Sequence, residues 1–196
     1  LGRFRINVFY QRSEVGMVVR HISNKIPAFA DLGLPQQLER LALKDRGLVL
    51  VVGATGSGKS TTLASMLDYR NTNRAGHIVC IEDPIEFLHR HKKSIIDQRE
   101  VGLDTQSFEH ALRNVLRESP DVIMIGEIRD KATMQHALHY SETGHLVVAT
   151  LHATNSVQAI ERMVNLFPEG ERKQTLSDIS MNLAGIIAQR LVPAVH

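Results

Sequence analysis

The sequence is poor in cysteine, in long apolar runs and in net charge. Its one cysteine, Cys80, excludes an internal disulfide framework and a four-cysteine zinc site, and its apolar neighbours predict a small core residue. No apolar run approaches the roughly 20 residues that cross a bilayer, so we expect a cytoplasmic protein without membrane insertion. The net charge of +2 is too small to indicate a nucleic-acid partner, and the basic run at residues 89–93 is typical of a solvated loop.

What is present suits one α/β domain. With 43% hydrophobic residues, the 196-residue chain can form a substantial core. Apolar runs predict buried strands at residues 48–52, 77–81, 121–125 and 146–151, with a short one at 94–97. Helical patterns lie at residues 36–44, 61–67, 108–118, 132–143, 156–166 and 169–188, and a polar turn is expected at 71–76. Alternating strands and helices indicate a largely parallel sheet flanked by helices.

The first thirty residues have a different pattern. Residues 4–10 and 16–22 alternate partly with period two, and the polar residues 11–14 between them favour a turn, which predicts a β-hairpin. Proline and glycine then interrupt the chain, so we place a boundary near residues 24–31. The chain begins without methionine and ends on an apolar segment, which we interpret as an internal piece of a longer protein.

The most specific motif follows the first buried strand. It matches the phosphate-binding pattern G-x-x-x-x-G-K-[ST] at every fixed position: Gly53, Ala54, Thr55, Gly56, Ser57, Gly58, Lys59 and Ser60, with Thr61 next in the helix. The glycines allow a tight turn whose N–H groups face an anion. Lys59 can reach the β- and γ-phosphates, and Ser60 can ligate Mg²⁺. A glycine-rich turn with a chance lysine is the alternative, but the strand before and the helix after it argue against that.

Polar residues also stand at the ends of the other three strands. In a parallel sheet these ends meet at one edge, where ligands bind. The second strand supplies Glu82, Asp83 and Glu86; the third and fourth supply Glu127, Arg129, Asp130 and His152. Four strand ends that converge are stronger evidence for a site than any one motif.

An acidic residue near the phosphate-binding loop is needed to hold Mg²⁺ or to orient the attacking water. Gly126 stands where an aspartate is often found, so Glu127 is expected to take the acidic role; a surface pair with Arg129 is the alternative. Glu86 is our preferred residue for polarising water. Glu82 and Asp83 could bind Mg²⁺-bound water or hold the loop, and any of these acids could instead serve as a cap or in an ion pair. The division of roles between Glu86 and Glu127 stays open.

Two histidines flank the fourth strand. His152 follows it directly and is expected to contact or sense the γ-phosphate. His145 precedes the strand, so strand rise places it more than ~15 Å away, at a subunit contact or simply in the core.

Together these segments resemble the secretion-type hexameric ATPases, and within them the type IV pilus retraction (twitching motility) ATPases, PilT/PilU-like proteins. Residues 53–61, 81–87, 125–130 and 143–154 are similar, in order, to the family's Walker A, aspartate, Walker B and histidine boxes. The glycine-glutamate form of the third box is characteristic of the family. The single cysteine is similar to the retraction branch, because assembly motors usually carry a four-cysteine zinc element. Residues 68–71 and 189–193 favour the PilU-like paralogue.

The resemblance implies a RecA-like P-loop ATPase that uses ATP and Mg²⁺ in a homo-hexamer and drives pilus retraction. It also implies a cytoplasmic position at the inner membrane, with the pilus platform protein and a paralogous retraction ATPase as partners. One alternative is an accessory nucleotide-binding paralogue that assists a principal motor. A nucleic-acid translocase is another, and the near-neutral charge weighs against it.

The resemblance also divides the chain into two parts. Residues 1–27 resemble the end of a PAS-like, β-rich N-terminal domain, and residues 28–196 the ATPase domain with its C-terminal helices truncated. Arg5 and Arg20 match positions that supply arginines to the nucleotide site, where a guanidinium would stabilise the transferred phosphoryl group. Solvated strand arginines are the alternative.

Overall fold

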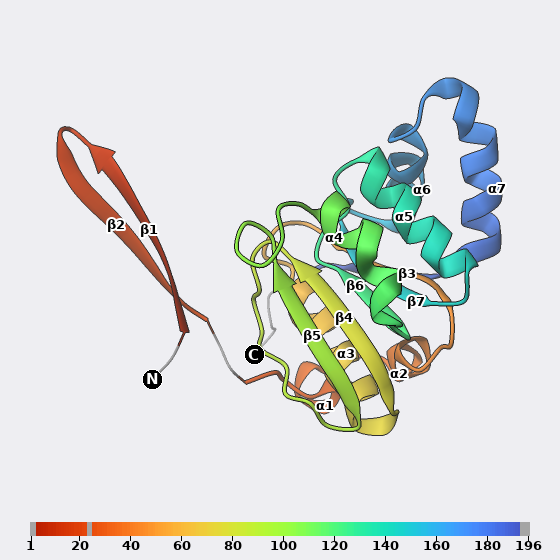
Figure 1. The fold of residues 1–196 in the computed structure, drawn as a ribbon, viewed down its shortest axis with the longest axis horizontal. Helices are drawn as coiled ribbons and strands as arrows, with labels where there is room; N and C mark the ends of the chain where they lie inside the picture. The colour runs from red at the N-terminus through yellow and green to blue at the C-terminus, as the bar shows by residue number, and fades with distance from the viewer. Residues whose placement is uncertain (1–2, 23–24, 193–196) are drawn as a thin grey trace.

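The computed structural model describes residues 3–22 and 25–192, and within them six strands form one sheet (Figure 1). The strand order is β5-β4-β6-β7-β3-β8, and every pair of neighbours is parallel. The strands are β3 (Gly47–Gly53), β4 (Gly76–Glu82), β5 (Ser94–Glu100), β6 (Val122–Ile125), β7 (Leu146–Leu151) and β8 (Leu183–Gln189). The predicted α/β fold with a largely parallel sheet is confirmed.

Helices cover both faces of this sheet (Figure 1). One face carries α1 (Phe29–Leu32), α2 (Gln37–Ala42) and α3 (Lys59–Asn73). The other carries α4 (Phe108–Val115), α5 (Lys131–Glu142), α6 (Ser156–Asn165) and α7 (Arg172–Asn182), with 3-10 turns at Leu116–Glu118 and Glu169–Glu171. None of the helices in the described ranges is both long enough and apolar enough to span a bilayer.

β3 is buried along its whole length and contributes to two cores. Leu48, Leu50 and Val52 face the core beneath α4–α7, whereas Val49 and Val51 face the core beneath α3. Side chains of a strand alternate between the two faces, so an unbroken apolar run fits a strand covered on both sides. Cys80 on β4 is fully buried in the second core, as its apolar surroundings predict.

The predicted helix at residues 169–188 is wrong from residue 183 onward. α7 ends at Asn182, and the next seven residues form β8, which pairs in parallel with β3 from Leu48↔Leu183 to Gly53↔Gln189. This pairing satisfies the backbone groups along the second edge of β3. The stabilisation comes from hydrogen bonds to β3, which is distant in sequence. The local apolar pattern of residues 183–188 does not distinguish a short buried strand from a helix.

Other boundaries also differ from the sequence prediction. α3 reaches Asn73, so it occupies the first part of the expected polar turn at residues 71–76. β5 reaches Glu100 rather than residue 97, because it pairs with β4 as far as Glu82↔Glu100. α1 was not expected, α2 is shorter than predicted, and the helix from residue 108 changes to a 3-10 turn at its end.

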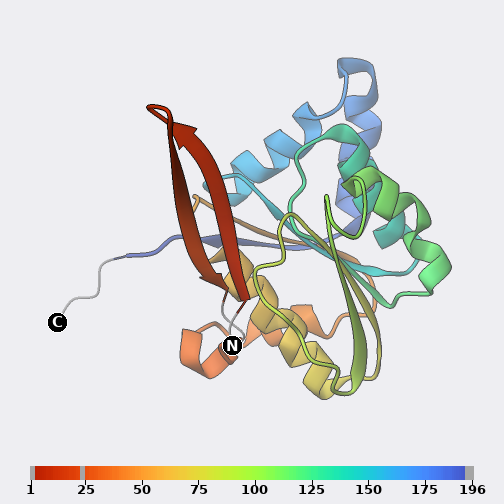
Figure 2. The same cartoon turned by 60° about the vertical axis from the view of Figure 1, so that its left-hand side comes forward.

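The predicted N-terminal hairpin is confirmed as β1 (Arg3–Gln11) and β2 (Glu14–Ile22), paired antiparallel through a two-residue turn. Arg12 and Ser13 have positive φ angles of 47° and 66°, as tight hairpin turns require. Figures 1 and 2 show the hairpin projecting away from the central sheet. Residues 1–2, 23–24 and 193–196 lie outside the described ranges, and so do Asn24 of the expected boundary and Pro193 of the segment at 189–193.

The two faces of the hairpin differ in chemistry. The register places apolar residues opposite one another on one face, in the pairs Ile6↔Val19, Val8↔Met17 and Tyr10↔Val15. Each of these side chains is more than half exposed, and Tyr10 is 81% exposed. The other face carries Arg5 opposite Arg20. A large apolar face open to water is unusual for a finished domain surface.

Candidate functional site

A cavity of about 600 Å³ lies where the carboxyl ends of β3, β4, β6 and β7 meet. This volume lies within the range of small-molecule sites. Most of the site residues expected from the sequence line it: Arg5, Arg20, Thr55, Gly56, Gly58, Lys59, Ser60, Thr61, Glu86, Glu127 and His152. The convergence of strand ends that the sequence predicts is therefore present in the structure.

The phosphate-binding loop joins β3 to α3 and depends on its glycines. Gly56 and Gly58 have φ angles of +77° and +88°, a conformation that residues with side chains rarely adopt. Gly53 is needed for a different reason, since a Cβ there would lie 2.5 Å from both the Gln189 carbonyl oxygen and the Ser57 hydroxyl. Ala54 and Gly53 contribute carbonyl groups to the base of the loop.

Lys59 is folded back over this loop. Its Nζ donates to the carbonyl oxygens of Gly53 at 3.1 Å and Ala54 at 3.0 Å. Burial lowers the pKa of Lys59, whereas the charges of Glu127 and Glu86 raise it. The ammonium group thus stands between two carboxylates and the loop, where a phosphate could replace the weaker carbonyl contacts with charge-assisted ones.

The first turn of α3 completes the loop. Ser57 Oγ is buried without a hydrogen-bond partner among the described residues, and Ser60 and Thr61 line the cavity. The N-terminal N–H groups of a helix have no partners within the helix and favour an anion. From β8, the Gln189 side chain accepts a hydrogen bond from Thr62 Oγ1 at 2.9 Å and so supports this turn.

Glu127 is held between two cationic or polar neighbours. Its Oε1 lies 2.8 Å from His152 Nε2, and its Oε2 accepts from the Arg129 guanidinium at 2.6 Å. The side chain of Glu127 is only 17% exposed, and that of His152 is 41% exposed. The structure therefore brings the expected acid and the expected sensor into direct contact, and also contains the Glu127–Arg129 pair considered as the alternative.

The glycine before this acid has a steric reason. A Cβ at Gly126 would lie 3.2 Å from both the Glu82 Cα and the Ile81 carbonyl oxygen of the neighbouring strand β4. Its own carbonyl oxygen accepts from Thr150 Oγ1 at 2.6 Å, which ties it to β7. An aspartate side chain at this position would be crowded by the backbone of β4, which favours glycine here and the acid one residue later.

The three acids after β4 occupy different environments. Glu86 is exposed on the loop and lines the cavity. Asp83 lies 3.5 Å from Arg129. Glu82 is 8% exposed, and burial raises its pKa to about 7, although hydrogen bonds from the Gln98 amide and the Glu86 backbone N–H lower it.

His145 lies away from the cavity, and Asp130 caps a helix. His145, at the opposite end of β7 from His152, contacts the Tyr140 carbonyl oxygen and Thr143 Oγ1 and does not line the cavity, as its position in the sequence predicts. Asp130 caps α5, because its side chain accepts from the Thr133 N–H at 2.8 Å.

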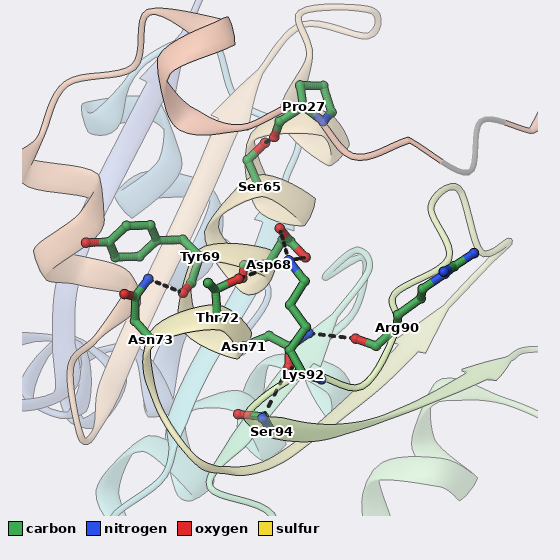
Figure 3. A network of polar contacts seen from close by, with 10 residues as sticks. All are labelled: Pro27, Ser65, Asp68, Tyr69, Asn71, Thr72, Asn73, Arg90, Lys92 and Ser94. Carbon is green, nitrogen blue, oxygen red and sulfur yellow. Dashed lines mark hydrogen bonds and ion pairs between the residues drawn. The ribbon is translucent and has the colours of Figure 1, made fainter.

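The loop that carries Glu86 is fastened at its far end by α3 (Figure 3). The Asn71 amide donates to the Arg90 carbonyl oxygen at 2.7 Å and accepts from the N–H groups of Lys92 and Ser94. Lys92 also forms an ion pair with Asp68, one turn earlier on the helix. On the same helix, Ser65 Oγ donates to the Pro27 carbonyl oxygen in the segment that leads from the hairpin.

Sequence reasoning missed the neutral amides of this region, Asn71, Gln98 and Gln189. Each bonds to backbone or side-chain atoms distant in sequence, and none belongs to one of the four nucleotide-binding boxes, although Asn71 and Gln189 lie in the two segments that favour the PilU-like paralogue. The one available signal was the presence of Asn71 in the expected polar turn, which the longer α3 now explains.

Comparisons with known proteins agree with this geometry. The model of the type II/IV secretion system protein family matches residues 3–196. Two curated proteins of Pseudomonas aeruginosa are similar: the type IV pilus ATPase PilU, 58% identical over 98% of this chain and 50% of PilU, and the retraction ATPase PilT, 48% identical over 100% and 57%. A crystal structure of the pilus retraction motor PilT with bound ADP matches with a TM-score of 0.95 and 53% identity, covering 98% of this chain and 56% of that one.

The chain thus spans about half the length of these relatives. The match covers the hairpin, the sheet and all four strand ends, and it confirms the resemblance drawn from the sequence motifs. This chain belongs to the type II/IV secretion system protein family.

Proposed function

We propose that this chain is the nucleotide-hydrolysing part of an ATP-driven motor for type IV pilus retraction. The observation that supports this most directly is the single cavity in which the phosphate-binding loop, Glu86, Glu127 and His152 meet. The relatives named as pilus ATPases and the ADP bound to PilT support ATP as the substrate. An enzyme of this class works by positioning and electrostatic stabilisation, which such a cavity can provide.

The residues divide into binding and reacting groups. In this proposal the loop N–H groups and Lys59 bind the phosphates, and Ser60 and Glu127 hold Mg²⁺, which neutralises phosphate charge when bound. Hydroxyl and carboxylate oxygens are suitable Mg²⁺ ligands, and Mg²⁺ commonly keeps several waters and binds the substrate phosphates. In the described part of the chain, no group of three or more His, Cys, Asp or Glu side chains could hold a metal ion. A Mg²⁺ site with few protein ligands, completed by water and phosphate, therefore fits the residues better than an all-protein cage.

Glu86 and His152 complete the site in this proposal. Glu86 lies on an exposed loop at the cavity wall, where its carboxylate can orient a water molecule towards the γ-phosphate. His152 reports the state of the phosphate through its contact with Glu127 at 2.8 Å. Arg5 and Arg20 act as clamps, since both line the cavity from the same face of the hairpin.

We also infer that the hairpin is the end of a PAS-like N-terminal domain and that residues 28–196 form the ATPase domain. The exposed apolar face of the hairpin supports this, because the remainder of a larger domain would cover it. In the full-length protein we expect a homo-hexamer at the cytoplasmic side of the inner membrane, acting on the pilus platform protein.

The test is steady-state phosphate release by the full-length protein, before and after the change Lys59→Ala. Loss of the ammonium group should reduce ATP turnover by at least 100-fold, because the phosphate charge is no longer compensated. Lys173→Ala, at an exposed lysine of α7, is the matched control and should leave turnover unchanged. Undiminished turnover in Lys59→Ala would overturn the assignment.

An accessory role is the second candidate, and the higher identity to PilU than to PilT favours it. An accessory paralogue would add to retraction only together with a principal motor. Phosphate release by the purified protein alone, compared with release in a mixture with a PilT-like ATPase, separates the two roles. Turnover that appears only in the mixture would favour the accessory one.

A further inference from the structure

The loop at residues 83–93 brings Glu86 to the cavity without a helix or strand of its own. Buried backbone groups in such a loop need partners from elsewhere in the protein. Side chains of β4, β5 and α3 supply many of these partners. The position of Glu86 is therefore determined by side chains that do not themselves belong to any nucleotide-binding motif.

Gln98 on β5 makes three of these contacts. Its Nε2 donates to Glu82 Oε1 at 2.9 Å and to the Phe87 carbonyl oxygen at 2.8 Å, and its Oε1 accepts from the His89 N–H at 2.9 Å. One side chain thus holds the loop immediately after Glu86 and connects it to the end of β4. Two donors and one acceptor in this arrangement require a primary amide, since a carboxylate of the same shape has nothing to donate.

Glu82, the partner of Gln98 at the end of β4, also holds the loop, at the backbone of Glu86. Its buried carboxylate accepts from the Gln98 amide and from the backbone N–H of Glu86. One residue earlier, the Ile85 N–H donates to Glu100 Oε2 at 3.1 Å. The main chain at residues 85–89 is therefore fixed at successive points, and the side chain of Glu86 projects from the fixed part.

These contacts separate two tasks among the acids. Both Glu82 and Glu86 line the cavity, but Glu86 is exposed, whereas Glu82 is largely buried and already accepts hydrogen bonds. A carboxylate that already accepts from a side-chain amide and a backbone N–H has less capacity left for a metal-bound water. The geometry thus favours a supporting role for Glu82 over direct metal binding.

From these contacts we infer that Gln98, together with Glu82, is a positioning residue for the hydrolytic step: it holds the loop so that Glu86 meets the attacking water. The inference rests on the proposed ATPase function. Because misplacement of a reacting group by about 1 Å can cost on the order of 100-fold in rate, loss of this support should lower kcat and spare nucleotide binding.

The experiment measures kcat, the KM for ATP and the Kd for a fluorescent ADP analogue in the full-length protein. Gln98→Glu keeps the shape of the side chain but places a second carboxylate against Glu82 and the Phe87 carbonyl oxygen. Gln98→Leu removes all three hydrogen bonds without adding charge. Both should lower kcat by about 10- to 100-fold and change the KM and Kd less than threefold. The control is Gln37→Glu, the same chemical change at an exposed residue of α2.

A double variant tests whether Gln98 acts through Glu86. If it does, Gln98→Glu added to Glu86→Gln should lower kcat by less than twofold more, because the group being positioned is already lost. If the losses of kcat in Gln98→Glu and Glu86→Gln multiply in the double variant, the inference is overturned. Loss of ADP binding in both Gln98→Glu and Gln98→Leu would also overturn it, since Gln98 would then support the whole domain. If Lys59→Ala leaves turnover intact, the proposed function fails; if it abolishes turnover while both Gln98 variants keep wild-type kcat, only the positioning role fails.

Discussion

At the scale of a single residue, Gly126 favours placing the acid one residue later, at Glu127, because a side chain at Gly126 would crowd β4. A Cβ at this position would lie 3.2 Å from the Glu82 Cα and the Ile81 carbonyl oxygen, so the close approach of β4 and β6 favours glycine here. The close approach brings the start of the Glu86 loop beside Glu127. Glu86 and Glu127, whose roles the sequence could not separate, both line the cavity and both act on the charge of Lys59.

The buried Glu82 predicts a measurable pH effect on stability. Burial raises its pKa from 4.5 to about 7, with smaller contributions from the charges of Glu86 and Glu100, while the hydrogen bonds from Gln98 and the Glu86 N–H oppose the shift. Between these two pH values the native protein binds more protons than the unfolded chain, so the free energy of unfolding falls as pH rises. Glu82→Gln should remove this fall and stabilise the domain at pH 8 by on the order of 3 kcal/mol.

Urea unfolding of both proteins at pH 4.5 and pH 8 tests this expectation. The two should have similar stability at the lower pH, where the carboxyl group is protonated in the native state and about half protonated in the unfolded chain. Glu161→Gln, on an exposed part of α6, controls for the loss of one negative charge. A Glu82→Gln variant that is less stable than the wild type at pH 8 would contradict the prediction.

Residues that act through a local pattern could be predicted from the sequence, and those that act through distant partners could not. Lys59, Ser60, Glu127 and His152 were found because each sits at a fixed place relative to a strand or a glycine motif. Gln98 escaped notice because its partners are a buried carboxylate and two backbone groups of another segment, and an isolated glutamine in a strand has no characteristic neighbours.

At the scale of elements, β3 is specified by its local sequence pattern, whereas β8 depends on pairing with a distant strand. β3 is an unbroken apolar run followed by glycines and was predicted within a residue or two. β8 was predicted as helix because a run that includes Leu183 and Ile186 fits both periods, and only its pairing with β3 decides between them. The polar residues at the end of α3 likewise favour a turn by their pattern, although Asn71 is fully buried in the helix.

Asn71 gives a second stability prediction, concerning the junction between α3 and the Glu86 loop. Asn71→Ala removes the amide that bonds to the Arg90 carbonyl oxygen and to the Ser94 N–H (Figure 3). It leaves the Lys92 N–H with only its longer contact of 3.3 Å to the Ser94 carbonyl oxygen. Unsatisfied buried groups are costly, so the free energy of unfolding should fall by about 2–4 kcal/mol. Urea unfolding measures the change. Asn73→Ala, whose amide bonds to Tyr69 at the exposed end of the same helix, should cost less than about 0.5 kcal/mol; equal losses in the two variants would contradict the account.

At the scale of the whole molecule, the hairpin lines the cavity through Arg5 and Arg20 but adds little to the cores of the sheet. None of the described side chains of β1 or β2 belongs to either core cluster, although Ile22 at the end of β2 is buried, and the apolar face around Val8 and Met17 is exposed. A chain of residues 25–196 should therefore unfold within a few degrees of the 196-residue chain, and it should self-associate less because that face is gone. Thermal unfolding and light scattering measure the two effects. A large loss of thermal stability in the shorter chain would show that the hairpin supports the ATPase domain.

The pairing of β3 along both of its edges has a mechanical consequence. β3 is bonded along both edges, to β7 and to β8, so the phosphate-binding loop extends from a strand that cannot slide without breaking two ladders at once. The opposite wall of the cavity, around Glu86, is attached by a few amide and carboxylate groups such as Gln98. The wall formed by the phosphate-binding loop is therefore stiffer than the wall formed by the Glu86 loop. Strain applied to the site deforms the Glu86 loop first.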